Sequence, residues 1–203
     1  MKNARFLLAP VLWAAATFPA LAAPIPLAEL SAWLNDLNSV RGDFTQANGD
    51  GTVSTGAFFL KRPGRARFEY APPDDTLVIA GGGQVAIFDG RSNTGPEQYP
   101  LSRTPLSIIL ARNVNLSQSG MVVDHREDSG RTIVTAQDPE HPEYGSLRLV
   151  FTADPVRLHG WIVTDGGGGQ TAVTIGNVER GVRLSDNKFS IVLETMAREQ
   201  QGR

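Results

Sequence analysis

The residue whose type and position first suggest chemistry is Arg62, at the end of the run Gly56–Arg62. If this run is extended, Phe58, Leu60 and Arg62 share one face, because successive side chains of a strand alternate between faces. A guanidinium rarely lies on an apolar face without a partner, since an unpaired buried charge is costly. The spacing therefore predicts that another part of the chain pairs with Arg62.

Residue types that suit catalysis or metal binding are sparse. The histidines His125, His141 and His159 stand apart, without metal-ligand spacing. No serine lies in G-x-S-x-G, and the chain has no cysteine to act as a thiol nucleophile. The glycine runs at 81–83 and 166–169 lack the G-x-G-x-x-G register and are typical of hairpin turns. We expect no metal and no cofactor; a carboxylate pair assembled in space stays open, as the basis of a disfavoured enzyme.

Length and composition fit one soluble domain that is rich in turns. The chain has 203 residues, 41% of them hydrophobic, and 21 glycines. Without Lys2 and Arg5, 17 basic residues face 21 acidic ones, a formal charge of -4. This balance argues against nucleic acid or an anionic membrane surface as a partner, because both require clustered basic residues.

The first 22 residues predict a signal peptide. Lys2 and Arg5 precede the mainly apolar segment Phe6–Phe18, and A-L-A at 20–22 supplies the small-x-small cleavage pattern. The apolar segment is too short to span a bilayer comfortably. With no cysteine to lipidate, we expect a free periplasmic protein whose single domain comprises residues 23–203.

The elements that position Arg62 are mostly short strands. Strict alternation in Arg65–Tyr70 is the period-two pattern of a half-buried antiparallel strand. Similar runs separated by turn residues give about ten or eleven strands, the last at Phe189–Leu193. We expect turns over 90–100 and a frayed tail from Arg198. Short connections favour a single antiparallel sheet that closes or curls.

Two helical segments accompany the strands. Leucines at helical spacing from Leu27 predict an amphipathic helix that ends near Gly42. Thr104 and Pro105 suit the cap and first position of a short apolar helix that runs toward Asn113. Such a helix is too short to be stable alone, so it must lie against an apolar surface. The two helices can cover either a packed core or a cavity, and composition does not decide between them.

Several motifs together resemble the LolA family of periplasmic outer-membrane lipoprotein carriers. Each motif is weak alone, but their order and spacing are specific, and they cover about residues 27 to 193. In chain order they are F-x-Q at 44–46, K-R-P at 61–63, F-E-Y at 68–70, T-P at 104–105, G-Q-T at 169–171 and D-x-x-F at 186–189.

The resemblance implies an unclosed β-barrel with an α-helical lid, whose hydrophobic cavity takes up the acyl chains of lipoproteins. It implies a monomeric, non-enzymatic chaperone in the periplasm. Such a carrier takes cargo from an inner-membrane lipoprotein-releasing ABC transporter and passes it to an outer-membrane acceptor lipoprotein. The acceptor carries a lipidated cysteine, so the absence of cysteine here favours the soluble carrier.

The resemblance also implies roles for individual residues. The arginine that matches Arg62 hydrogen-bonds the lid and keeps the empty cavity closed, in line with its position on an apolar face and its five fixed donors. The cavity is expected to comprise Phe44, Phe58, Leu60, Phe68, Tyr70 and Ile87. The lid is expected to comprise Leu30, Leu34, Leu106, Ile109 and Leu110.

The sequence departs from the family pattern at Ala66 and Ala86, where the family often has aromatic residues. The smaller side chains are expected to widen the cavity or loosen the seat of the lid. A specialised relative with another lipid cargo therefore stays open, as do the cargo itself and the number of acyl chains. Two other functions also stay open: a regulatory or sensory lipid-binding domain of the same fold, and, less favoured, an esterase or glycan-modifying enzyme.

Overall fold

The computed structural model describes residues 23–90, 94–117 and 120–201, so the predicted signal peptide lies outside the described residues. Eleven strands form a single sheet in which every recorded pairing is antiparallel. The strands are β1 (Ser39–Ala47), β2 (Val53–Lys61), β3 (Arg65–Tyr70), β4 (Leu77–Gly81), β5 (Gln84–Phe88), β6 (Glu97–Pro100), β7 (Val122–Asp128), β8 (Arg131–Gln137), β9 (Ser146–Thr152), β10 (Arg157–Thr164) and β11 (Gln170–Arg180).

The strand order explains why the barrel stays open. It runs β6-β5-β4-β3-β2-β1-β11-β10-β9-β8-β7, so β6 and β7 are the two edges. The chain meanders outward from β1 to β6, crosses to the far edge at β7, and meanders back until β11 pairs with β1. The mainly β fold with one unclosed antiparallel sheet is confirmed. The strand β6 lies within the region where only turns were expected.

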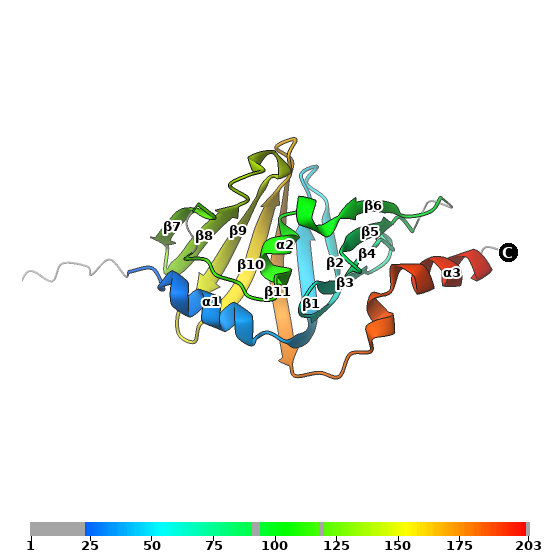
Figure 1. The fold of residues 1–203 in the computed structure, drawn as a ribbon, viewed down its shortest axis with the longest axis horizontal. Helices are drawn as coiled ribbons and strands as arrows, with labels where there is room; N and C mark the ends of the chain where they lie inside the picture. The colour runs from blue at the N-terminus through cyan, green and yellow to red at the C-terminus, as the bar shows by residue number, and fades with distance from the viewer. Residues whose placement is uncertain (1–22, 91–93, 118–119, 202–203) are drawn as a thin grey trace, which may run out of the picture.

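Two helices cover the concave face of the sheet. They are α1 (Leu27–Asp36) and α2 (Leu106–Leu110), which lies in the crossing between β6 and β7. Figure 1 shows both helices in front of the same face of the sheet. The first helix ends at Asp36 rather than near Gly42, because β1 already begins at Ser39. Short 3-10 segments occur at Leu101–Arg103, Pro142–Tyr144 and Asp186–Phe189.

Beneath the N-terminal part of α1 the concave face is a packed core. Leu30 on the helix is fully buried against strands β8 and β9, whose inward side chains Val134, Leu149 and Phe151 are also fully buried. Trp33 meets Phe151 edge to face, with ring centroids 5.7 Å apart. This end of α1 is therefore held to the sheet by close apolar packing.

The prediction of a strand at Phe189–Leu193 and of a frayed tail is wrong. The segment forms the 3-10 turn Asp186–Phe189 and then α3 (Ile191–Gln201), which lies at the β3–β6 end of the sheet in Figure 1. A short apolar run is compatible with a strand or a helix. Here packing against the convex face of the sheet selects the helix. Ile191 packs on a small second apolar cluster there, made up of Leu77, Ile79, Ala86 and Phe88.

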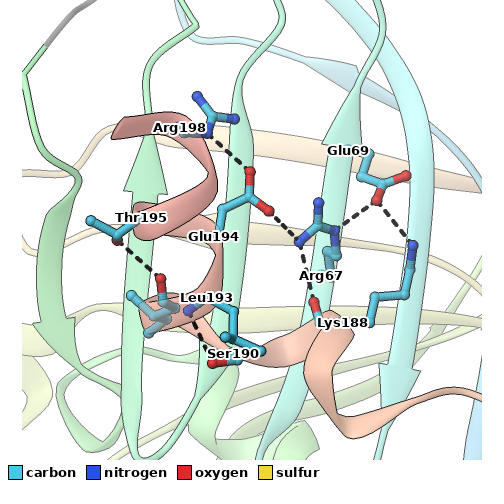
Figure 2. A network of polar contacts seen from close by, with 9 residues as sticks. Arg67, Glu69, Lys188, Ser190, Leu193, Glu194, Thr195 and Arg198 are labelled. Atoms are coloured by element: carbon cyan, nitrogen blue, oxygen red, sulfur yellow. Dashed lines mark hydrogen bonds and ion pairs between the residues drawn. The ribbon is translucent and has the colours of Figure 1, made fainter. Parts of the chain in front are cut away.

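A charged network holds α3 in place, as Figure 2 shows. Arg67 contacts Glu69 at 2.6 Å and Glu194 of α3 at 3.1 Å, and Lys188 contacts Glu69 at 3.1 Å. Burial acts to raise the pKa of Glu69, but hydrogen bonds from Arg67 and Lys188 outweigh it, so this pKa is lowered. Arg198 pairs with Glu194 and lies over the ring of Phe88. The alternating charges of β3 therefore serve to dock the C-terminal helix.

No helix in the described part of the chain is long and apolar enough to cross a bilayer.

Candidate functional site

A cavity of about 820 Å³ lies between the concave face of the sheet and the two covering helices. Cavities that bind small ligands range from about 300 to 1,000 Å³, so this one has the size of a ligand site. Its walls are mostly apolar and come from α1, α2 and the strands β1, β2, β3, β9, β10 and β11. They include Trp33, Leu34, Phe58, Phe68, Ile109 and Trp161.

Phe68 is the centre of the aromatic wall of this cavity. Its ring stacks on Phe58 with centroids 6.2 Å apart and meets Trp161 edge to face, also at 6.2 Å. Behind it, Phe44 makes edge contacts with Phe68 at 5.7 Å and with Tyr70 at 5.0 Å. Strands from both halves of the sheet thus contribute to one aromatic wall. No single stretch of the sequence contains all of its residues.

Of the six expected cavity residues, the structure places Phe58, Leu60 and Phe68 in the lining. Phe44, Tyr70 and Ile87 lie outside the lining. Phe44 is 3% exposed and supports the wall from behind. Tyr70 donates a hydrogen bond to Oε1 of Gln46 at 2.6 Å, and burial raises the pKa of Tyr70 to about 12.

The part of the wall that β10 and β11 form was not among the expected residues. Leu158, Trp161 and Ile175 line the cavity there. On β10 the run Trp161-Ile162-Val163 does not alternate, and a bulge separates Leu158 from Gly160, so the sequence signal does not show which side chains form a cavity wall. The pairing of β11 with β1 brings this wall to the first one.

The covering helices divide between lining and packing. Leu34, Leu106 and Ile109 face the cavity. Leu30 and Leu110 are 0% and 1% exposed and belong to the packed core instead. Five lid residues were expected; three of them border the space that a ligand would occupy, and two anchor the helices.

Arg62 bridges the sheet to both covering helices. Its guanidinium donates to the carbonyl oxygens of Leu34 in α1 and of Ala111, directly after α2. Longer hydrogen bonds reach the carbonyl of Arg112 at 3.3 Å and Oδ1 of Asn35 at 3.1 Å. We call this set of contacts the Arg62 bridge. One side chain thus bonds carbonyls at the C-terminal ends of two helices, where donors are scarce; the carbonyl of Leu34 also accepts from the backbone N–H of Leu37 at 3.2 Å.

The Arg62 bridge is imperfectly satisfied. Burial lowers the pKa of Arg62, because the charged form is partly removed from water. Its Nε atom is buried and has no hydrogen-bond partner among the residues that the structure describes. The desolvation of this group opposes the gain from its other hydrogen bonds. The closed arrangement is therefore less stable than a fully bonded one would be.

The covering segments are joined to each other, so that they form one body. Nδ2 of Asn35 donates to the carbonyl of Val114 at 2.9 Å, and Oδ1 of Asn35 accepts from the backbone N–H of Val114 at 2.8 Å. Ser31 accepts from the N–H of Leu116 at 2.9 Å. We call α1 together with residues 106–116 the lid. In addition to Arg62, the sheet side binds it through the N–H of Gly64, which donates to the carbonyl of Leu110 at 2.9 Å.

The two departures from the family pattern do not shape the cavity. Ala66 and Ala86 are both fully buried, and neither lines it. Ala66 faces the main core, whereas Ala86 belongs to the apolar cluster on the convex face that Ile191 covers. The small side chain at 86 thus lies beneath the segment that leads into α3. The expectation that both alanines widen the cavity or loosen the lid finds no contact to support it.

Within residues 23–90, 94–117 and 120–201, no three histidine or carboxylate side chains are grouped so as to hold a metal ion. Two of the three histidines instead have separate local contacts. His125 Nε2 lies 3.0 Å from the carbonyl of Ile25, and His141 pairs with Glu143. The chemistry that this site offers is the binding of an apolar group.

Comparisons with known proteins agree with this geometry. A family model described as outer membrane lipoprotein carrier protein LolA matches residues 35–192, well over half of the chain. A protein from Methylococcus capsulatus named outer-membrane lipoprotein carrier protein is 24% identical over 184 residues, which cover 85% of this chain and 86% of the relative. One of the same name from Ralstonia nicotianae is 26% identical and covers 94% of each chain.

Solved structures are more distantly similar. An uncharacterised conserved protein from Thermus thermophilus gives a TM-score of 0.47 at 8% identity, covering 80% of this chain and 90% of its own. A LolA superfamily protein from Nitrosomonas europaea gives a TM-score of 0.44 at 10% identity, covering 82% of this chain and 98% of its own.

Proposed function

The chain belongs to the LolA family of outer-membrane lipoprotein carrier proteins, and from this we propose that it is a periplasmic chaperone that carries lipoproteins by their acyl chains. The observation that carries the proposal is the apolar cavity of about 820 Å³ beneath a lid that one arginine attaches to the sheet. The acyl chains would lie against Phe58, Phe68 and Trp161. The protein works as a monomer without a cofactor and performs no covalent chemistry.

The energy of acyl-chain burial explains why such a carrier needs a lid. Burying a chain of about 14 methylenes yields roughly 11 kcal/mol, at about 0.8 kcal/mol for each methylene. Two or three chains bound this well would reach the ceiling of non-covalent affinity and would not be released. Closure of the lid over the empty cavity opposes binding, because cargo must first displace the lid. The Arg62 bridge supplies that opposing free energy.

The incomplete bonding of Arg62 sets the balance between retention and release. Opening the lid breaks the hydrogen bonds to Leu34, Ala111 and Arg112 but returns the buried Nε atom to water. Lid opening is therefore less costly than the number of hydrogen bonds suggests. Asn35 and Ser31 join the two segments of the lid, so that its part next to Arg62 opens as a unit while Leu30 keeps the N-terminal part of α1 on the sheet.

The proposed partners follow from this role. An inner-membrane ABC transporter supplies the lipoprotein, and an outer-membrane acceptor lipoprotein receives it. Depletion of the protein from cells distinguishes a carrier from a sensor of the same fold: loss of a carrier leaves outer-membrane lipoproteins at the inner membrane, as membrane fractionation shows. Normal sorting after full depletion would contradict the carrier role.

Two variants link that phenotype to the cavity. Ile109→Asp places a charge in the apolar lining of the lid, whereas Val53→Asp places the same charge on an exposed strand residue remote from the cavity. We expect Val53→Asp to restore sorting in depleted cells and Ile109→Asp to fail, because a carboxylate that acyl chains desolvate is strongly unfavourable. Equal rescue by both variants would contradict a role for the cavity.

A further inference from the structure

The cavity carries positive charge and no carboxylate. Among the described residues that line it, Arg62, Arg157 and Arg180 are cations, and none is aspartate or glutamate. His159 also lines it, and burial together with the charge of Arg131 lowers the pKa of His159. A chain with an acidic overall balance thus has a locally basic cavity.

Arg157 and Arg180 differ from Arg62 in being available to a ligand. Arg157 begins β10, is exposed, and its side chain has no hydrogen bond or ion pair with any residue in the described part of the chain. Arg180 ends β11 and lies over the ring of Trp33, 4.7 Å from its centroid. Its ion pair with Asp36 is long, at 3.6 Å, and both side chains are exposed. Such an exposed ion pair contributes little to stability, so Arg180 can leave Asp36 and bind another anion.

The sheet places these two arginines at the same end of the cavity. The strands β10 and β11 pair with Gly160 opposite Thr174. Because the two strands are antiparallel, Arg157, which precedes Gly160, and Arg180, which follows Thr174, both lie beyond the same end of this pairing. Asn177 lines the cavity as well, and all three residues are exposed. Two long, flexible guanidinium side chains can therefore approach one anionic group at this solvent-facing mouth.

We propose that Arg157 and Arg180 bind the carboxylate or phosphate head group of an anionic acyl amphiphile whose chain occupies the cavity. This rests on the proposed function in using the same cavity for an acyl chain, but it names a ligand of different chemistry. The acylated amine of a lipoprotein's N-terminal cysteine is an amide and carries no charge, so it offers these arginines no anion. A free fatty acid carries its charge at the end of the chain, and an anionic phospholipid carries its charge one glycerol unit away.

The cavity contains its own reporter for a test. Trp33 and Trp161 both line it, and a brominated acyl chain quenches tryptophan fluorescence on contact. The purified protein is titrated at about pH 8, where a carboxylic acid is ionised. One pair of probes is dibromostearate and its methyl ester; the other is lysophosphatidic acid and the monoacylglycerol with the same brominated chain, which lacks the phosphate. We expect the anionic member to bind about tenfold more tightly than its partner.

Variants then test whether the preference for anionic probes depends on Arg157 and Arg180 at the mouth of the cavity. Arg157→Gln should weaken binding of the anionic probe about fivefold and leave binding of the neutral probe unchanged. The double variant with Arg180→Gln should remove the preference. Arg126→Gln makes the same change of charge on β7, outside the cavity, and should preserve it.

The possible results separate this inference from the carrier function. A preference in the carboxylate pair alone identifies a fatty acid, one in the phosphate pair alone identifies a phospholipid, and one in both supports a general head-group site. Equal affinity for charged and neutral probes, or a preference that survives the double variant, overturns the head-group site but leaves a cavity that binds acyl chains. Quenching by none of the four probes overturns both proposals.

Discussion

Replacing Arg62 by leucine tests the Arg62 bridge directly. The substitution removes the hydrogen bonds to Leu34, Ala111 and Arg112 while it retains an apolar stem on the cavity side. A hydrogen bond to a charged group contributes about 1.5 to 3 kcal/mol net. Because the buried Nε atom offsets part of this, we count the two bonds to Leu34 and Ala111 at the lower value, which gives about 3 kcal/mol.

This free energy sets the size of the expected change. A closed empty state that is about 3 kcal/mol more stable than the open state lowers the apparent affinity for a ligand by roughly 150-fold. Arg62→Leu should therefore bind a brominated acyl methyl ester up to about 150-fold more tightly than the wild type. It should also release the ligand to acceptor vesicles more slowly, because affinity differences between related complexes lie mostly in the dissociation rate.

The assay is the quenching of Trp33 and Trp161 by the ester, followed by recovery of fluorescence after mixing with vesicles. The matched control is Arg41→Gln, which removes an exposed arginine whose side chain pairs with Glu179 on the neighbouring strand. Circular dichroism establishes that each variant is folded. Unchanged affinity and unchanged release in Arg62→Leu would refute the idea that this arginine opposes loading.

Three further predictions concern the lid, the core and the C-terminal helix. Asn35→Leu leaves the N–H and carbonyl of Val114 without partners, so urea denaturation should show a loss of about 1–2 kcal/mol, and an unchanged midpoint would count against a jointed lid. Phe151→Ala empties a fully buried site and should cost about 3–5 kcal/mol of unfolding free energy; a loss below 1 kcal/mol, roughly, would mean that this core is loosely packed. The third concerns pH: since the folded pKa of Glu69 is lowered, its stabilising effect is complete above the unfolded pKa and is lost as pH falls through the folded one. A fluorophore on Met196→Cys, an exposed site in a chain without cysteine, should report loosening of α3 below about pH 4 and none at neutral pH, whereas a flat signal down to acid unfolding would contradict this docking.

The fold was largely predictable because the strands carry strong local signals. The alternation of charged and apolar residues in Arg65–Tyr70 predicted both ends of β3 correctly, and turn residues separated most of the other strands. Local signals were insufficient at the C-terminus. The run from Phe189 to Leu193 is short and apolar, and only its contact with the convex face selects a helix. Contacts of this kind join residues that are far apart in the chain, so the local pattern of apolar residues does not predict them.

The candidate site was predictable in part for the same reason. The position of Arg62 beside Phe58 and Leu60 follows from the parity of one strand, and all three line the cavity. By contrast, Phe44 and Tyr70 share that apolar face but support the wall from behind, a distinction that depends on the curvature of the sheet. The mouth at Arg157 and Arg180 depends on the antiparallel pairing of β10 with β11, which the sequence does not show.

The side chain of Ile175 on β11 offers the most direct measurement of whether lipoprotein acyl chains enter the cavity. Benzoylphenylalanine at Ile175 in growing cells should, after irradiation, form covalent adducts with acylated lipoproteins, detected by their mobility and by mass spectrometry of the attached lipid. The same group at Val53, which is 66% exposed and remote from the cavity, should form none. Lipoprotein adducts at Ile175 alone are the predicted result; their absence there, or equal yields at both positions, would contradict a carrier that holds its cargo in this cavity.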